Sequence, residues 1–568
     1  MAHALPDSIP GMTEAMNGAM TDVVTDVVTD AMIDAVTGTM TDVMTGTATD
    51  VLTDELTDEL IDTSTDNMTD EFIQNISPRP IRFYYRGGIA EVAAVAPTRS
   101  VLDWLREDQG CTGTKEGCAE GDCGACTVVL GELDAQGHLC LKPVNACIQF
   151  VPTLDGRALF TVEDIAGLAA PDKLHPVQQC LVDCHGSQCG FCTPGFVMSL
   201  WATYERHQTA GTVPTRQQLA DDLSGNLCRC TGYRPILDAG QQMFTRPAAP
   251  LPRQAVTDAL STLAQDPPLH TAEGFHAPRT RAEFARLRQA RPAAHVLAGS
   301  TDIGLWVNKQ FRDLPELLYI GRVAELQRVD VYADSLWIGA ATPLDVAWAA
   351  LARDWPALRD VWLRFASLPI RGSGTMGGNV ANGSPIGDAA PVLMALGAQV
   401  ELQQGERLRR MPLQDFYLNY MKNALEPGEF LSGICVPRPG FGNGGQLRVY
   451  KISKRFDCDI SAVCAALWLR LDDAGHVQGA HLAFGGMAGI VRRAWQAENA
   501  LLGQPWNEHA LQAAQAALAR DFTPLSDMRA SAGYRLQVAQ NLLRRFWLET
   551  RQTDPLPATA LSVWEAMR

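Results

Sequence analysis

The sequence lacks three features that would each assign it to a broad class of proteins. No run of apolar residues approaches the roughly 18 that a membrane-spanning helix needs. Residues 1–78 contain 16 acidic residues and no lysine or arginine, and the rest of the chain balances 47 basic against 48 acidic residues, so no basic groove for nucleic acid is expected. The N-terminus shows neither the basic and apolar regions of a secretory signal nor a twin arginine. We therefore expect a cytoplasmic protein.

The acidic segment at residues 1–78 is also of low complexity. Thr-Asp recurs there with a four-residue step, as at Thr21–Asp22 and Thr25–Asp26. This step drifts against the helical period of about 3.6 residues, Thr and Asp are indifferent helix formers, and Asp side chains at i and i+4 repel each other. We expect a disordered acidic tail, with a docked helix as the alternative.

Cysteine is scarce except in one segment, because 12 of the 15 cysteines lie between Cys111 and Cys230. Clustered cysteines in a cytoplasmic protein are more often metal ligands than disulfides. Eight of them form two quartets, C-x4-C-x2-C with a later cysteine and C-x-x-C with a later C-x-C, and each quartet suits a 2Fe–2S cluster. The predicted ligands are Cys118, Cys123, Cys126 and Cys147 for the first cluster and Cys189, Cys192, Cys228 and Cys230 for the second. Gly117, Gly121 and Gly124 are expected to let the first loop wrap tightly around its cluster.

Other interpretations of these cysteines stay open at the level of sequence. A structural zinc site is the alternative for the first quartet, and C-x-x-C alone also suits a redox dithiol or half of a zinc site. Cys180 and Cys184 compete as ligands of the second quartet, while Cys111 and Cys140 fall outside the spacing of the first. Two neighbouring one-electron centres indicate a protein that moves electrons.

The segments around the quartets predict a domain of strands and a helix, followed by a helical domain. Strands are expected at Ile81–Tyr85 and Glu91–Val95, joined by a turn at Gly87–Gly88, and a helix is expected at Val101–Arg106. Residues 161–245 predict helices with loops at the second quartet.

Two glycine-bearing turns further along the chain are candidates for binding the phosphate and hydroxyl groups of a ligand. Val296–Gly304 is typical of a strand entering a polar turn, whose backbone N–H groups suit a pyrophosphate. Gly374–Asn379, followed by Asp388, offers close backbone approach and one carboxylate. An ordinary strand–turn–helix junction is the alternative for the first turn, and no G-x-G-x-x-G fingerprint follows a strand.

The two quartets in this order, with the strings Cys118–Cys126, Gln188–Gly195 and Cys228–Pro235, resemble the iron–sulfur half of the xanthine dehydrogenase and aldehyde oxidase family of molybdenum hydroxylases. The glycine-bearing turns resemble the FAD domain of the same family. The resemblance covers about residues 80–555 and implies an α+β multidomain protein. Its implied parts, after the tail at 1–78, are a β-grasp ferredoxin-like domain at 79–160, a four-helix 2Fe–2S domain at 161–245, a linker at 246–274, a PCMH-type α+β FAD-binding domain at 275–442 and a C-terminal α/β flavoprotein domain at 443–556.

The resemblance also implies which residues contact the cofactors. The implied FAD contacts are Val296, Leu297, Ala298, Gly299, Ser300, Thr301, Asp302, Ile303, Phe365, Thr375, Met376, Gly377, Gly378, Asn379, Asp388, Phe430 and Lys451. Gln188 matches a glutamine that contacts the pterin of a molybdopterin on a partner chain, and Cys230 matches the cluster ligand beside it. Ser453–Ile460 matches the loop beside the flavin where the electron acceptor approaches.

The family's molybdenum domain is several hundred residues long, and we expect no room for it in this chain. The resemblance therefore implies the electron-transfer subunit of a xanthine dehydrogenase, similar to the small subunit of bacterial two-chain members, in a heterotetramer of two small and two large chains. The partner chain oxidises hypoxanthine and xanthine to urate, and electrons pass through the second cluster, the first cluster and FAD to NAD+, so no residue of this chain is catalytic. The same module in an aldehyde or N-heterocycle dehydrogenase is the alternative. A zinc-stabilised binding scaffold is the hypothesis from another class.

Overall fold

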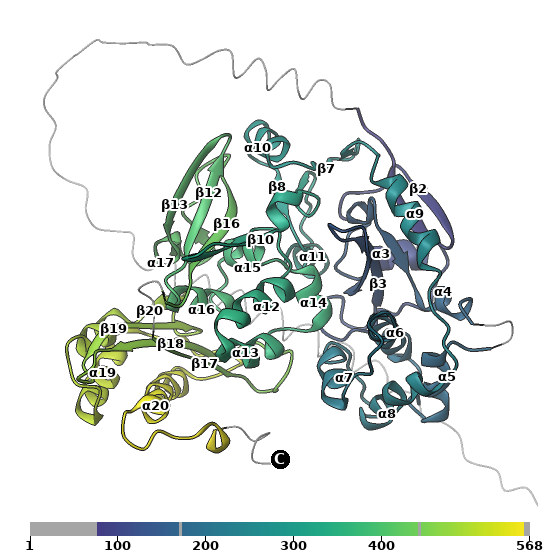
Figure 1. The fold of residues 1–568 in the computed structure, drawn as a ribbon. Coiled ribbons are helices and arrows are strands. Elements are labelled where there is room, and N and C mark those ends of the chain that lie inside the picture. The colour runs from purple at the N-terminus through teal and green to yellow at the C-terminus, as the bar shows by residue number, and fades with distance from the viewer. Residues whose placement is uncertain (1–76, 170–172, 441–444, 562–568) are drawn as a thin grey trace, which may run out of the picture. The chain divides into compact units, whose positions relative to one another are not determined.

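The computed structural model describes residues 77–169, 173–440 and 445–561. The predicted acidic tail lies outside the described residues except for its last two positions. All described residues belong to one compact unit. Along this unit a mixed sheet, a group of helices and two further regions of strands and helices follow one another (Figure 1).

The first sheet has five strands in the order β2-β1-β5-β3-β4. The strands are β1 (Ile81–Tyr85), β2 (Gly88–Val92), β3 (Thr127–Leu133), β4 (Leu139–Asn145) and β5 (Ala158–Phe160). β1 pairs in parallel with β5 and all other pairs of the sheet are antiparallel. The expected helix is present as α3 (Val101–Asp103), capped by the Ser100 side chain and continued by a π-helical turn to Asp108. The long segment between α3 and β3 carries the first three cysteines of the first quartet.

The predicted hairpin between the first two strands is present, but its return strand begins earlier than expected. Arg86 and Gly87 have φ values of 50° and 83°, which are the left-handed conformations of a two-residue type I′ turn. Because this turn closes after two residues, Gly88 already belongs to the strand, and β2 ends at Val92 rather than at Val95.

The second region is helical, as predicted. Its helices are α4 (Val162–Ala166), α5 (Pro176–Asp183), α6 (Thr193–Ala210), α7 (Arg216–Asp222) and α8 (Arg234–Gln242). The long helix α6 packs against β3 and β4 and buries Trp201 completely. It begins directly after Cys192, and α8 begins four residues after Cys230. Each helix has proline in its first turn, where proline costs no hydrogen bond and favours the start of a helix. Both helices therefore start next to a cysteine pair.

Two larger sheets and a two-stranded sheet of β14 (Tyr417–Asn419) and β15 (Lys422–Asn423) form the region between residues 269 and 437. The larger sheets have the strand orders β6-β7-β9-β8 and β10-β11-β16-β12-β13. Their strands are β6 (Leu269–His270), β7 (Phe275–Ala277), β8 (His295–Leu297), β9 (Leu317–Tyr319), β10 (Val329–Val331), β11 (Ser335–Gly339), β12 (Gln399–Gln404), β13 (Arg407–Pro412) and β16 (Phe430–Pro437). The helices are α10 (Arg281–Ala290), α11 (Ile303–Asn308), α12 (Leu344–Asp354), α13 (Arg359–Arg364), α14 (Leu368–Ser373), α15 (Met376–Asn382) and α16 (Ala389–Ala395). A further helix, α9 (Arg253–Leu263), occupies the segment predicted as a linker.

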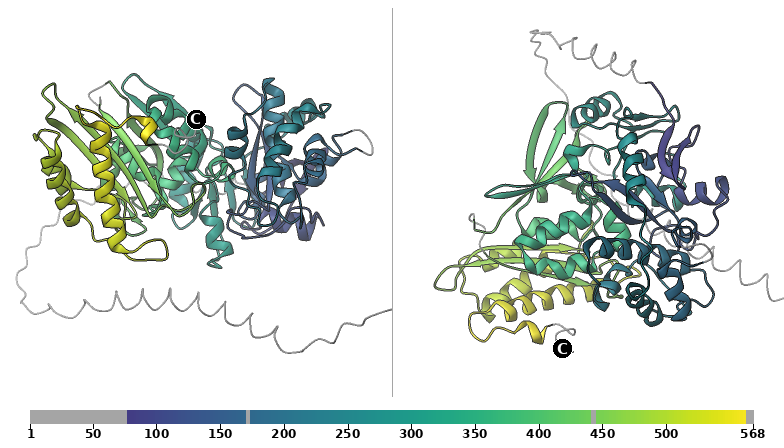
Figure 2. Two further views of the ribbon diagram at one scale, coloured as in Figure 1. Left: turned by 90° about the horizontal axis from the view of Figure 1, so that it is seen from below. Right: turned by 45° about the vertical axis from the view of Figure 1, so that its right-hand side comes forward.

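The last region is an antiparallel sheet with helices on its faces. Its strands are β17 (Gln446–Ile452), β18 (Val463–Leu471), β19 (Val477–Gly485) and β20 (Arg492–Arg493), followed by α18 (Trp495–Leu501), α19 (Glu508–Asp521) and α20 (Ala532–Thr550). Helices α19 and α20 lie side by side along one face, and α16 packs against β18 and β19 (Figures 1 and 2).

One hydrophobic core joins the first sheet to the small sheet β6–β9. Phe83 and Phe150 from the first region and Phe275 and Leu297 from the small sheet are all buried in this core. Helix α11 packs on it through Ile303 and its neighbours. The core therefore holds the first cysteine loop close to the turn that follows β8. The predicted α+β multidomain class is confirmed, and in the described part of the chain no helix is long and apolar enough to cross a membrane.

Candidate functional site

The four cysteines of the first quartet lie together. Cys126 Sγ and Cys147 Sγ are 3.3 Å apart, and the backbone N–H of Cys123 donates to Cys118 Sγ at 3.3 Å. The β3–β4 hairpin brings Cys147 back to Cys126, because its register places Thr127 opposite Asn145. Cys126 stands just before Thr127 and Cys147 two residues after Asn145, so they meet at the same end of the sheet.

The loop around the first quartet is shaped to hold anionic sulfur. The Cys123 thiol and the N–H groups of Cys123, Glu120 and Asp122 lower the pKa of Cys118 to about 5, against the opposing effect of burial. Thiolates are the form that ligates metals. Of the three glycines expected to shape the loop, Gly121 and Gly124 have positive φ values of 79° and 69°.

The second quartet has the same paired arrangement, built from the loops before α6 and α8. Cys230 Sγ and Cys189 Sγ are 3.2 Å apart, and the Cys192 thiol is hydrogen-bonded to Cys228. Burial and the bond to Cys228 raise the pKa of Cys192 to about 12. Burial also opposes ionisation of Cys228, but the N–H of Thr231 and the Cys192 thiol outweigh it and lower its pKa. One thiol of each buried pair is therefore favoured as the anion.

The competing cysteines lie outside both quartets. Cys180 Sγ accepts a hydrogen bond from Arg246 Nε at 3.3 Å, and Cys184 follows the last residue of α5. Cys111 forms a hydrogen bond with the Tyr85 hydroxyl at 3.2 Å. Cys180 and Cys111 are thus tied to other partners.

The pairing of the thiols is informative about the metal that would fit. Among residues 77–169, 173–440 and 445–561, no three His, Cys, Asp or Glu side chains converge on the position of a single metal ion. Two close pairs of thiols suit a 2Fe–2S cluster, in which each iron takes two protein ligands. The donor set in both quartets fits this group, which would make each site a one-electron carrier.

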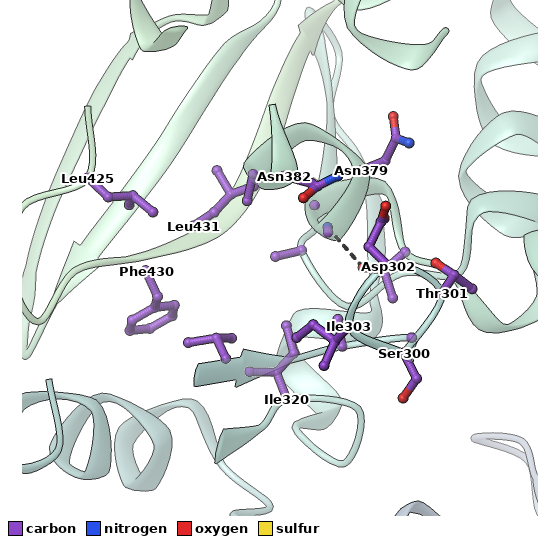
Figure 3. A pocket seen from close by; sticks show the side chains of 18 of the residues that line it. Ser300, Thr301, Asp302, Ile303, Ile320, Asn379, Asn382, Leu425, Phe430 and Leu431 are labelled. Carbon is purple, nitrogen blue, oxygen red and sulfur yellow. Dashed lines mark hydrogen bonds between the residues drawn. The ribbon is translucent and has the colours of Figure 1, made fainter. Parts of the chain in front are cut away.

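A cavity of 240 Å³ lies between the turn after β8, the start of α15 and the start of β16 (Figure 3). The predicted contacts that line it are Val296, Ala298, Gly299, Ser300, Thr301, Asp302, Ile303, Thr375, Gly377, Gly378, Asn379 and Phe430. Leu297 and Met376 lie between these residues in the chain, but their side chains are fully buried in the neighbouring cores. The two predicted glycine-bearing turns thus form one site.

The two turns approach each other through glycine. A Cβ at Gly299 would clash with the carbonyl of Ser373 and lie 2.6 Å from Gly374 Cα. On the second turn, Thr375 Oγ1 accepts from the Gly378 N–H at 3.0 Å and so starts α15. Close packing of the two backbones therefore requires a residue without a side chain at position 299.

The polar end of the cavity carries buried groups that have no protein partner. Ser300 Oγ and Asn379 Oδ1 are buried and make no hydrogen bond with another described residue. Burial also raises the pKa of Asp302. Buried polar atoms are normally hydrogen-bonded, so these atoms fit a polar ligand such as a phosphate or a sugar hydroxyl. The residues present thus fit a dinucleotide.

The opposite end of the cavity is apolar, and Phe430 is its predicted residue. Phe284 and Phe430 meet edge to face with ring centroids 4.7 Å apart, and Leu425 and Leu431 complete the wall. This end suits a flat ring. Arg288 also lines the cavity and donates to backbone carbonyls, including that of Glu429 at 3.3 Å. Phe284 and Arg288 come from α10, Leu431 from the start of β16 and Leu425 from the segment before it. All lie far from both glycine-bearing turns, and no local motif marks them.

Three other implied flavin contacts lie outside the cavity wall. Lys451 Nζ donates to Asp388 Oδ2 at 2.6 Å and to Ser461 Oγ at 2.9 Å, while Asp388 Oδ1 is buried without a partner. Phe365 packs on Trp348 with ring centroids 5.7 Å apart. The structure does not bring these residues into the cavity, and their role as flavin contacts stays a prediction.

The remaining implied contacts lie on the cysteine loops and on the loop at residues 453–460. Gln188 is exposed beside Cys189. In the 453–460 loop, Cys458 donates to the carbonyls of Ser224 at 3.1 Å and Ala366 at 3.4 Å. This loop thus contacts both the helical region and the cavity region.

The fold and the sites together define an iron–sulfur flavoprotein. Three protein-family models match the chain: the 2Fe–2S binding domain over residues 161–241, the FAD binding domain in molybdopterin dehydrogenase over residues 270–439, and the CO dehydrogenase flavoprotein C-terminal domain over residues 448–550. The chain belongs to the molybdenum hydroxylase family and carries its iron–sulfur and FAD-binding domains.

Curated relatives of the chain include xanthine dehydrogenases. The chain is 31% identical to that of Emericella nidulans over 547 residues, which cover 84% of this chain and 39% of the relative. It is 33% identical to that of Drosophila pseudoobscura pseudoobscura, covering 73% of this chain and 35% of the relative. It is 31% identical to the xanthine dehydrogenase/oxidase of Rattus norvegicus, with coverages of 75% and 35%. The chain thus spans under two-fifths of the length of these relatives.

Solved structures of similar chains cover about half of this chain. The cyanide-inactivated form of Cu,Mo-CO dehydrogenase matches 48% of this chain and 95% of its own chain, at 28% identity and a TM-score of 0.45. Quinoline 2-oxidoreductase from Pseudomonas putida 86 matches 50% and 99%, at 23% identity and a TM-score of 0.45.

Proposed function

We propose that this chain is the electron-transfer subunit of a cytoplasmic xanthine dehydrogenase. In this proposal a molybdopterin-bearing partner chain oxidises hypoxanthine and xanthine to urate, and this chain carries the electrons to NAD+. The curated relatives named above support the substrate class, because three of them at 31–33% identity are xanthine dehydrogenases or a dehydrogenase/oxidase.

The observation that carries the proposal is the difference in exposure between the two thiol quartets. Cys126 and Cys147 of the first quartet are each 2% exposed, whereas Cys189 and Cys230 of the second are exposed. A buried centre can only relay electrons within the chain, while an exposed one can receive them from another protein. The second cluster is therefore the entry point, and the first cluster relays electrons towards the dinucleotide cavity.

The surface around the entry point suits a partner chain. Phe191 and Tyr233 flank the second quartet with 48% and 46% of their surfaces exposed. Exposed aromatic side chains of this kind are enriched at protein interfaces. We propose that the molybdopterin chain covers them, with Gln188 facing the pterin, in an assembly of two small and two large chains.

The bound groups would supply the redox chemistry, and this chain would supply their positions. The eight quartet cysteines would ligate the clusters, and the walls of the cavity would hold FAD. FAD accepts electrons singly and passes on a hydride, which makes NAD+ a suitable acceptor. No side chain of this subunit is required to act as an acid or base on the purine.

Co-expression with the chain encoded beside it tests the proposal. We expect the two chains to purify together and to reduce NAD+ with xanthine and hypoxanthine. Activity with aldehydes or N-heterocycles but not with purines would assign the module to another molybdenum dehydrogenase. A purified chain that contains zinc and no iron or flavin would refute electron transfer altogether.

A further inference from the structure

The loop of the first quartet is held from the helical region by one buried carboxamide. Asn226 is 2% exposed, and its Nδ2 donates to the carbonyl of Gly124 at 3.0 Å and to Thr127 Oγ1 at 3.2 Å. Its Oδ1 accepts from Ser199 Oγ at 2.6 Å, which fixes the orientation of the amide. Gly124 lies between two predicted ligands of the first cluster, and Asn226 lies two residues before Cys228 of the second.

The same loop is held from the cavity region by a second carboxamide. Asn308 Nδ2 donates to the carbonyls of Ala119 at 3.0 Å and of Cys147 at 2.8 Å. Asn308 is the last residue of α11, and that helix begins directly after the Ser300–Asp302 turn of the dinucleotide cavity. One short helix therefore runs from the wall of the cavity to the backbone of a predicted cluster ligand.

The backbones of the two quartets are themselves joined by one hydrogen bond. The N–H of Leu227, the residue before Cys228, donates to the carbonyl of Cys123 at 3.0 Å. The approach is as close as glycine allows, since a Cβ at Gly124 would lie 2.6 Å from Asn226 Nδ2 and would also clash with the backbone of Gly225. A ligand of one quartet is thus linked to a ligand of the other through backbone and a single hydrogen bond.

We propose that Asn226 and Asn308 are positioning residues for electron transfer, Asn226 for the step between the two clusters and Asn308 for the step between the first cluster and the flavin. The inference deepens the proposed function and rests on it. Each step moves one electron from a reduced to an oxidised centre and neither forms nor breaks a covalent bond. Its rate therefore depends on the spacing of the centres and on the bonded links between them, which these two carboxamides fix.

The roles of Asn226 and Asn308 can be tested independently, because each residue makes a different set of hydrogen bonds. Asn226→Ala removes the donations to Gly124 and Thr127 but leaves the Asn308 contacts intact, and Asn308→Ala does the reverse. Asn226→Asp is nearly isosteric, and it keeps the acceptor for Ser199 while losing both donations. Asn507→Ala is the matched control, because Asn507 caps α19 through a hydrogen bond to the Ala510 N–H, outside the electron path.

The experiment uses the full chain loaded with both clusters and FAD, mixed with NADH under anaerobic conditions. Absorbance and rapid-freeze EPR follow the flavin and each cluster in turn. We expect Asn226→Ala and Asn226→Asp to slow reduction of the second cluster on the order of tenfold, which corresponds to about 1.4 kcal/mol of activation free energy, with reduction of the first cluster unchanged. Asn308→Ala should slow reduction of the first cluster by a similar factor. Asn507→Ala should change neither rate.

A second readout needs no turnover and no NADH. In protein fully reduced with dithionite, the magnetic interaction between the two reduced clusters reports their spacing. We expect both Asn226 variants to change this splitting, and Asn308→Ala and Asn507→Ala to leave it as in the wild type. Wild-type splitting and wild-type rates in the Asn226 variants, at full iron and FAD content, would overturn the inference and leave the proposed function standing. A wild-type chain that binds no iron would overturn both.

Discussion

Substitution of Gly299 by alanine tests whether the two glycine-bearing turns form the FAD site. The added Cβ would clash with the Ser373 carbonyl oxygen and lie 2.6 Å from Gly374 Cα, whereas ordinary contact begins at 3.4 Å, so the two turns must separate by more than about 0.8 Å. The opposing atoms are backbone and cannot rotate away. Overpacking of this kind costs about 1–3 kcal/mol. The two turns must come together when FAD is bound, so this cost should appear as a loss of FAD affinity of roughly 5- to 150-fold.

The assay is a fluorescence titration of flavin-free protein with FAD, combined with thermal unfolding. Gly533→Ala is the matched control, because a Cβ at this position in the first turn of α20 has no atom within 4 Å. Alanine is favoured over glycine in a helix by up to about 1 kcal/mol, so the control should bind FAD normally and unfold at an equal or higher temperature. Wild-type FAD affinity in Gly299→Ala would refute the assignment of this cavity.

Two further predictions concern buried charge. Lys451→Met leaves the Asp388 carboxylate buried and unpaired, so it should lower the free energy of unfolding by about 3–5 kcal/mol in denaturant titrations. The control Arg455→Met breaks an exposed ion pair and should cost less than about 1 kcal/mol. Equal effects of the two variants would contradict this prediction. Burial lowers the pKa of His175 to about 4 from an ordinary 6.5, so the unfolded chain binds the proton more readily and stability should fall by roughly 3 kcal/mol as pH drops from 6.5 to 4. His175→Asn, which keeps an oxygen to cap α5, should flatten that pH dependence, and an unchanged slope would show that other groups cause it.

The sequence predicted the quartets because their spacing is largely local. Cys118, Cys123 and Cys126 share one loop, and the β3–β4 hairpin returns Cys147 to it. The turn at Gly299 was also marked, because a polar, glycine-bearing turn after a strand offers backbone N–H groups to a phosphate. Features of this kind depend on neighbours in the chain.

The parts that could not be predicted depend on long-range packing. Phe284 and Leu425 line the apolar end of the cavity from segments more than 130 residues apart, and neither belongs to a motif. Asn226 and Asn308 looked like ordinary polar residues, and only their contacts across domains give them a role. The resemblance also placed Asp388 beside the flavin, whereas the structure pairs it with Lys451 outside the cavity wall.

The central claim is that two separate iron–sulfur clusters and a flavin share this chain, and EPR with metal analysis tests it most directly. Two 2Fe–2S clusters require four irons and four sulfides, and the dithionite-reduced chain should give two distinct signals that integrate to two spins, with one FAD. Cys123→Ala should abolish one signal and Cys192→Ala the other. Loss of the same signal in both variants, or zinc in place of iron, would contradict the account.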